Sequence, residues 1–327
     1  MLLRAENINI SFRTPLGIAR VVENMSFKLD RGESLAIVGE SGSGKTSVLK
    51  TILGVLPPNA LVSGKLLFEG RNILGNKKEL IKLRGTKIAY IPQEPMVAFN
   101  PFYSIKEHFI DRLMLTGKEK MGLLKYYNMR RKAPKDLVDR ILEILTKVKV
   151  PDPKRVLESY PIQLSGGMLQ RVLIGLAVAT NPSLLLADEP TTALDVVTQK
   201  EILDLLKSLQ ESLRLSIIYV THDLGVAKMI SDKTIVMYAG HVVEKGATDE
   251  VLTEPLHPYT KGLVDAIPKL VGGELKGMEG ELVDYINPPP GCRFHPRCPH
   301  ATEKCKREKP PETNMGNGRV VSCWLYA

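Results

Sequence analysis

The sequence predicts an α/β fold with a mostly parallel sheet, and three observations lead to it. The apolar run 35–38 stops at a loop with three glycines, and a stretch with helical spacing follows. Apolar strands and helical segments then alternate regularly from about residue 167 to 238, which is typical of parallel strands covered by helices. Residues 2–12 and 21–29 alternate between apolar and polar side chains and predict a separate antiparallel β subdomain.

The composition is ordinary for a globular protein. Its 327 residues are 43% hydrophobic and 25% charged, and they are enough for about two domains. The longest apolar runs, such as 184–187, are far below the roughly 18 residues that a membrane span needs. The N-terminus has no signal-peptide pattern, so we expect a cytoplasmic protein whose contact with a membrane is peripheral.

The net charge of +9 is concentrated in two segments. Residues 118–135 hold seven basic side chains and one acidic one, and residues 292–309 hold six basic and two acidic. The rest of the chain therefore sums to −1, which argues against a uniformly basic surface and against nucleic acid as a partner. The first segment is interpreted as a solvated helical face, with contact to anionic lipids of the cytoplasmic leaflet as the alternative.

The remaining elements follow in chain order. A helix after Lys45 is stopped by Pro57 and Pro58, and strands are predicted at 66–68 and 87–91. A helical insertion at about 104–180 then interrupts the core. Further strands are expected at 183–187, 216–220 and 234–238, with a helix at about 195–213. The predicted domains are an α/β domain at 1–269, which contains the helical insertion, and a Cys-rich extension at 270–327.

The glycine-rich loop carries the strongest chemical signal. Residues 39–46 fit the phosphate-loop pattern G-x-x-x-x-G-K-[ST] at every fixed position, between a predicted strand and a predicted helix. Its glycines let successive N–H groups point inward, and the start of the helix adds a positive dipole end. The predicted phosphate-binding residues are Gly39, Glu40, Ser41, Gly42, Ser43, Gly44, Lys45, Thr46 and Ser47.

Two carboxylates end the apolar strand 184–187. Asp188 and Glu189 are expected at the carboxyl edge of the sheet, where open α/β folds bind ligands. Asp188 is the candidate Mg²⁺ ligand, and Glu189 is the candidate base that polarises an attacking water. The alternative, an acidic pair that only caps a helix, is weakened by the Thr-Thr-Ala-Leu-Asp sequence that follows.

Three further polar sites occur where predicted elements begin or end. Ser165, Gly166 and Gly167 open a helix, so a hydroxyl group and free N–H groups could bind an anion there. His222 follows the strand 216–220 and is expected at the same sheet edge. Gln93 lies where the core meets the helical insertion, which suggests a hinge.

All four cysteines lie in the last 36 residues, which indicates one local site. Cys292, Cys298, Cys305 and Cys323 have the spacing C-x5-C-x6-C-x17-C, without the close pairs of zinc ribbons. A reducing cytosol disfavours disulfides, and four loosely spaced thiolates suit a [4Fe–4S] cluster. Zinc bound by cysteines with His295 or His300 is the competing interpretation. The expected role is structural.

These motifs, in this order and with the sequence Ala193-Leu194-Asp195, resemble the ATPase subunit of an ABC transporter. The resemblance implies hydrolysis of ATP to ADP and phosphate, with Lys45, Thr46, Gln93 and Asp188 binding the nucleotide and Mg²⁺. It also implies Glu189 as the general base. It further implies that His222 contacts the γ-phosphate and that Asp195 lies at a dimer interface. Ser165, Gly166 and Gly167 would contact the ATP bound by the partner subunit.

The tail is similar to the C-terminal extension of dipeptide and oligopeptide importer ATPases, through residues 257–263 and 288–300. Homologues with this extension also serve nickel or oligosaccharide importers, and members of the family carry a [4Fe–4S] cluster there. The implied partners are a second ATPase subunit (paralogous or identical), two membrane permeases and an extracytoplasmic substrate-binding protein. A soluble ABC ATPase of translation or DNA repair remains the alternative function.

Two positions depart from the general family pattern. Met168 replaces the commonest glutamine, although the peptide-importer branch often has methionine there. An aromatic residue that stacks on adenine is expected about 20 residues before the phosphate loop, but residues 16–19 are not aromatic, and Phe12 is the nearest candidate. The tail, with its basic charge and Phe294, could alternatively form a zinc-based RNA- or DNA-binding module.

Overall fold

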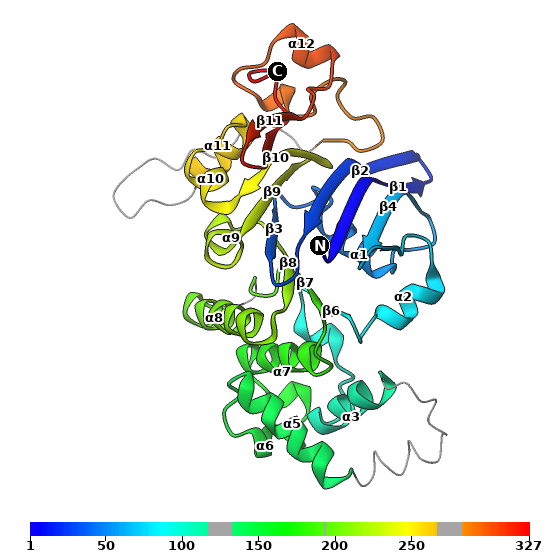
Figure 1. Cartoon of the computed structure of the whole chain (residues 1–327), viewed down its shortest axis with the longest axis vertical. Coiled ribbons are helices and arrows are strands. Elements are labelled where there is room, and N and C mark those ends of the chain that lie inside the picture. The colour runs from blue at the N-terminus through cyan, green and yellow to red at the C-terminus, as the bar shows by residue number, and fades with distance from the viewer. Residues whose placement is uncertain (117–132, 193, 267–282) are drawn as a thin grey trace. The chain divides into compact units, whose positions relative to one another are not determined.

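The computed structural model describes residues 1–116, 133–192, 194–266 and 283–327 (Figure 1). It divides into two compact units, one made of Met1–Leu80 with Ile218–Ala327 and the other of Ile81–Ile217. Most of the basic segment 118–135, the predicted boundary at residue 270 and Ala193 lie outside the described residues. No helix in the described ranges is long and apolar enough to cross a membrane.

The first unit contains the predicted antiparallel β subdomain. Its strands have the order β2-β1-β4-β5, and every described neighbour pair is antiparallel. The alternating pattern of residues 2–12 puts Leu3, Ala5 and Ile10 into the core. The strands are β1 (Leu3–Thr14), β2 (Gly17–Leu29), β4 (Ala60–Phe68) and β5 (Arg71–Asn72).

A second sheet of the first unit has the order β11-β12-β10-β9-β3-β8. Strand β3 is buried along its whole length and pairs in parallel with β9, as its continuous apolar run predicts. The strands are β3 (Ser34–Val38), β8 (Ser216–Thr221, whose first two residues belong to the second unit), β9 (Lys233–Tyr238), β10 (His241–Ala247), β11 (Thr313–Gly316) and β12 (Arg319–Val321).

The C-terminal extension takes part in this sheet and in its core. Strand β12 pairs with β10, with Val321 opposite Glu244, and Val321 is fully buried. Phe294 is 2% exposed and packs edge-on against Tyr238 and Tyr259, with ring centroids 5.0 and 5.4 Å apart. A buried ring cannot stack on a base, so the proposed nucleic-acid role of Phe294 was wrong.

Short helices complete the first unit. They are α1 (Lys45–Leu53), α9 (Leu224–Ile230), α10 (Thr248–Thr253), α11 (Pro258–Asp265) and α12 (Glu303–Arg307), with a 3-10 turn at His295–Arg297. Helix α2 (Lys77–Leu83) crosses the boundary between the units. Helix α1 follows the phosphate loop and ends at Gly54, three residues before the prolines that were expected to stop it.

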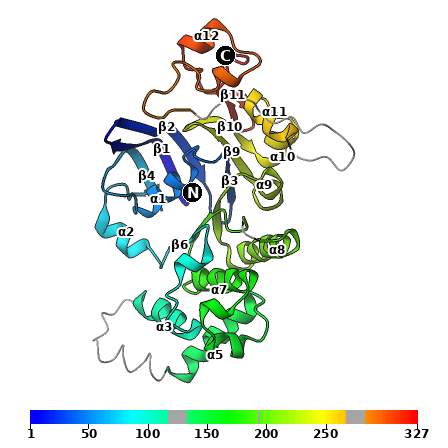
Figure 2. The same ribbon diagram turned by 180° about the vertical axis from the view of Figure 1, so that it is seen from behind.

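The second unit combines two parallel strands with most of the long helices. Strand β6 (Ile88–Ile91) pairs in parallel with β7 (Leu184–Asp188), which is fully buried. Helices α3, α5 and α7 pack together within this unit (Figure 2). The helices are α3 (Ile105–Leu115), α5 (Lys135–Lys147), α6 (Pro153–Glu158), α7 (Gly166–Val178) and α8 (Val196–Leu213), with 3-10 turns at Pro95–Ala98 and Pro161–Gln163. The predicted α/β core with a helical insertion is confirmed.

Candidate functional site

The glycine-rich loop joins β3 to α1, as the sequence predicts. Gly39, Gly42 and Gly44 have φ angles of 153°, 80° and 101°, which a side chain would strain. Lys45 is 4% exposed, and its ammonium group donates hydrogen bonds to the carbonyl oxygens of Gly39 and Glu40 at 2.8 and 2.9 Å. The loop therefore curls around the lysine and places a positive charge inside the predicted phosphate nest.

Gly39→Ala is expected to destabilise the protein more than Gly42→Ala. Both positions have positive φ, so each alanine has a strain cost of about 1 to 2 kcal/mol. A Cβ at Gly39 would also lie 2.2 Å from the carbonyl oxygen of Met237, whereas one at Gly42 meets nothing within 4 Å. This overpacking adds about 1 to 3 kcal/mol. Urea unfolding measures the difference, and equal losses for the two variants would contradict this interpretation.

Asp188 and Glu189 lie at the carboxyl end of β7. Asp188 is 3% exposed and accepts a hydrogen bond from the Tyr90 hydroxyl at 3.1 Å. Burial, and then the charge of Asp188, raise the pKa of Tyr90, so the tyrosine stays a donor. No sequence pattern pointed to Tyr90, because a tyrosine inside an apolar strand normally indicates packing.

Glu189 is brought together with Gln93. Because β6 and β7 are parallel neighbours, Gln93 and Glu189 follow adjacent strand ends, and the Gln93 amide donates to the Glu189 carboxylate at 3.3 Å. The Thr192 hydroxyl donates to the same oxygen at 3.1 Å. Glu189 itself has φ 45°, a left-handed conformation that costs energy and is typical of functional positions. Thr192 and this strain were missed by the sequence analysis.

The starts of α7 and α8 lie next to each other in the second unit. The Ser165 hydroxyl caps α7 by accepting from the Met168 N–H, and Ser165 and Gly166 are exposed. A Cβ on Gly167 would come within 2.7 Å of a Thr198 methyl group on α8. The second unit therefore brings the Ser-Gly-Gly helix start close to the first turn of α8.

Asp195 caps α8 and is exposed on the same part of the second unit. Its carboxylate accepts the N–H groups of Val197 and Thr198 at 3.1 and 3.0 Å. Hydrogen bonds from Thr198, above all its backbone N–H, lower the pKa of Asp195. Asp195 is thus a fixed negative charge near the exposed start of α7.

The remaining predicted residues lie in the first unit. Thr46 and Ser47 are half-buried in the first turn of α1. His222 directly follows β8 and is exposed, and the next residue, Asp223, caps α9. Phe12 is half-buried in β1, and its contact with adenine stays a prediction.

The four cysteines line one cavity of about 140 Å³, although the first and the last are 31 positions apart in the chain. All four thiols are free, and burial raises the pKa of Cys292 to about 11. His295 and His300 line the same cavity. Nevertheless, among the residues that the structure describes, no group of three or more Cys, His, Asp or Glu is arranged to hold a metal ion. This geometry therefore supports neither zinc nor the expected [4Fe–4S] cluster, and both stay predictions.

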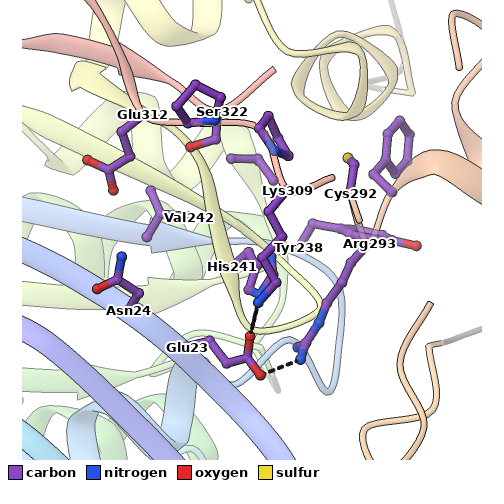
Figure 3. Close-up of a pocket in the computed structure, with 14 residues that line it drawn as sticks. Glu23, Asn24, Tyr238, His241, Val242, Cys292, Arg293, Lys309, Glu312 and Ser322 are labelled. Carbon is purple, nitrogen blue, oxygen red and sulfur yellow. Dashed lines mark hydrogen bonds and ion pairs between the residues drawn. The ribbon is translucent and has the colours of Figure 1, made fainter. Parts of the chain in front are cut away.

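A network of charges anchors the extension beside a cavity of about 190 Å³ (Figure 3). Glu23 of β2 accepts hydrogen bonds from His241 at 3.0 Å and from Lys309, and it forms an ion pair with Arg293 at 3.0 Å. The bond from His241, helped by Lys309 and Arg293, holds the pKa of Glu23 well below its usual value, although burial opposes this. Burial also lowers the pKa of His241, although its hydrogen bond with Glu23 opposes this.

Comparisons with known proteins agree with this geometry. A family model described as ABC transporter matches residues 22–192, and one described as the oligopeptide/dipeptide transporter C-terminal region matches residues 243–305. The dipeptide transport ATP-binding protein DppD of Bacillus subtilis is 40% identical, covering 99% of this chain and 94% of that protein. The oligopeptide transport ATP-binding protein OppD of Haemophilus influenzae is 40% identical, covering 100% and 98%.

Solved structures of nucleotide-binding cassettes share the fold. The ATP-binding cassette MJ0796, in a dimeric post-hydrolysis state with ADP and phosphate, is 29% identical with a TM-score of 0.62. The comparison covers 75% of this chain and 98% of that one. The cassette cbiO1 of Clostridium perfringens, part of the transporter complex cbiONQ, is 26% identical with a TM-score of 0.61, and the match covers 77% of this chain and 91% of that one.

Proposed function

We propose that the chain, which belongs to the ABC transporter family, hydrolyses ATP to power the uptake of peptides. Its C-terminal part matches the C-terminal region of oligopeptide/dipeptide transporters. The chain would act as the nucleotide-binding subunit of an importer, peripheral at the cytoplasmic face of the membrane. The full-length similarity to peptide-transport ATPases favours peptides over nickel or oligosaccharides. The match at residues 243–305 favours an importer over a soluble ABC ATPase.

One observation carries the hydrolytic role: Glu189 lies beside the buried Asp188 and is oriented by both Gln93 and Thr192. So placed, Glu189 would accept the proton of the water that attacks the γ-phosphate. Mg²⁺, held by Thr46, Gln93 and Asp188, would neutralise charge on the phosphates. The loop amides and Lys45, released from its two carbonyl partners, would bind the β- and γ-phosphates, and His222 would contact the γ-phosphate.

A second ATPase subunit is part of this proposal. The chain has one phosphate loop and one Ser-Gly-Gly helix start, and Ser165, Gly166 and Asp195 are exposed on the second unit. Exposed N–H groups at the start of α7 suit the phosphates of an ATP bound by another subunit. That subunit would be a paralogue or a second copy of this chain. The further partners would be two permeases and an extracytoplasmic binding protein.

Transport by the assembled complex tests the cargo. The chain would be co-purified with its permeases and partner ATPase and reconstituted in lipid vesicles with the binding protein. ATP-dependent uptake of labelled di- and oligopeptides is expected, and it should disappear with Glu189→Gln. Uptake of nickel or an oligosaccharide without peptide uptake would replace the peptide assignment while leaving the ATPase role intact.

We also propose that Cys292, Cys298, Cys305 and Cys323 hold a [4Fe–4S] cluster with a structural role. Its support is that all four thiols line one cavity. A cluster is wider than a single ion, so its ligands need not approach each other as closely as four zinc ligands must. Protein purified without oxygen should be brown and contain iron and acid-labile sulfide, both lost in Cys298→Ser. Stoichiometric zinc without sulfide would contradict the proposal.

A further inference from the structure

The side chain of Glu40, in the phosphate loop, is held by the C-terminal extension. The Arg297 guanidinium donates two hydrogen bonds to its carboxylate, at 2.8 and 3.1 Å. This fork-shaped geometry gives the strongest and most directional kind of ion pair. The Arg297 side chain is 7% exposed and also lies over the ring of Tyr238, with 5.7 Å to the centroid. The Arg297 end of the pair is therefore buried, whereas the Glu40 side chain is 28% exposed, so the pair is only partly open to solvent.

The backbone of the same loop is held from the same side. The Glu40 N–H donates to the hydroxyl of the fully buried Tyr259 at 2.9 Å. The Tyr285 hydroxyl donates to the Gly42 carbonyl at 2.7 Å. Because the Glu40 carbonyl in turn accepts from Lys45, the residue is fixed through its side chain, its N–H and its carbonyl. Three contacts from the region after residue 258 thus set the path of the loop.

Arg297 is itself firmly supported. It ends the 3-10 turn that follows Phe294, whose ring is packed between Tyr238 and Tyr259. Beside that ring, Arg293 donates to the carbonyls of Ala239 and Arg20 and pairs with Glu23 (Figure 3). The Arg297 guanidinium therefore projects from a well-packed segment and donates to the Glu40 carboxylate.

The charge of Glu40 gives this contact a direct consequence for nucleotide binding. A carboxylate in the loop that receives a triphosphate would repel it, unless a cation cancels the charge. We propose that Arg297 is a positioning residue for the nucleotide: it neutralises Glu40 while the two tyrosines hold the loop backbone, so that the extension sets the affinity for ATP. This inference rests on the proposed function of the loop.

A double-mutant comparison separates this role from a merely structural one. In the full chain, Arg297→Met should raise the Kd of Mg·ATP about tenfold, because a charge is left unpaired in the loop. Glu40→Gln alone should change it less than about threefold, and Arg297→Met/Glu40→Gln should return close to the Glu40→Gln value. High salt should shrink the Arg297→Met defect. Arg307→Met, an exposed arginine of the same extension, is the matched control and should bind like the wild type.

The rescue by Glu40→Gln is the decisive result. Two results would overturn the inference: a double variant that binds Mg·ATP as weakly as Arg297→Met does, or Arg297→Met that binds it with unchanged affinity. In either case, binding of Mg·ATP by the wild type would leave the proposed function intact. Failure of the wild type to bind Mg·ATP would instead overturn both. If Arg297→Met does not fold, Arg297→Lys, which keeps the charge but loses the fork, should show a smaller defect. Adding Glu40→Gln to Arg297→Lys should restore the affinity for Mg·ATP. If the affinity stays low in that double variant, the inference is equally overturned.

Discussion

Glu189→Gln is expected to keep Mg·ATP binding and to lower ATP turnover by about 10²- to 10⁴-fold, the usual contribution of a general base. Glutamine preserves the shape of the side chain and its hydrogen bonds with Gln93 and Thr192, so the geometry of the site should be retained. It cannot accept a proton, which removes the proposed step. Phosphate release from the assembled complex, measured beside equilibrium nucleotide binding, gives both quantities.

Glu158→Gln is a suitable control for this prediction. Glu158 is an exposed carboxylate of the same unit, it pairs with Lys106 at 3.0 Å, and it has no proposed catalytic role. Its loss should leave turnover unchanged, because exposed pairs contribute little. Near-normal hydrolysis by Glu189→Gln would show that another group acts as the base, whereas lost nucleotide binding would mean that the carboxylate is needed for the architecture of the site.

The parts of the site that the sequence predicts are those set by local chemistry. A phosphate loop needs glycines, a lysine and a hydroxyl at fixed spacing, so residues 39–46 are recognisable without any tertiary information. The apolar run 184–187 before Asp188 and Glu189 likewise predicts a buried strand with polar residues at its end. In both cases neighbouring residues in the chain carry the whole signal.

The parts that escaped prediction depend on distant residues. Arg297 and Glu40 are 257 positions apart, and no local pattern pairs them. Tyr90 on β6 contacts Asp188 on the neighbouring strand β7. The left-handed backbone conformation of Glu189 likewise depends on the fold around it. These contacts depend on the order of the strands in the sheet, which the alternation of strands and helices along the sequence does not determine.

The extension shows the same limit. The four clustered cysteines predicted an extension that a cluster with a structural role stabilises. In the structure, Phe294 and Val321 are buried, and β12 pairs with β10, so apolar contacts and backbone hydrogen bonds already attach the extension. A cluster would then stabilise a segment that is already docked beside the phosphate loop. Loss of the cluster is consequently expected to weaken the extension without unfolding the ATPase core.

Lys45→Ala is expected to remove about half or more of the stabilisation of the protein by Mg·ATP. The wild type should gain about 2.7 kcal/mol at a ligand concentration of 100 Kd, whereas loss of a charge-assisted contact to the phosphates raises Kd about 10- to 100-fold. Thermal unfolding with and without Mg·ATP measures this difference.

Lys50→Ala, which removes an exposed lysine on the same helix, is the control and should keep the full shift. Since Lys45 donates hydrogen bonds to two loop carbonyls, its loss also loosens the loop, and binding to ADP should weaken in parallel. An unchanged shift in Lys45→Ala would place the triphosphate elsewhere and remove the basis for every role assigned around this loop.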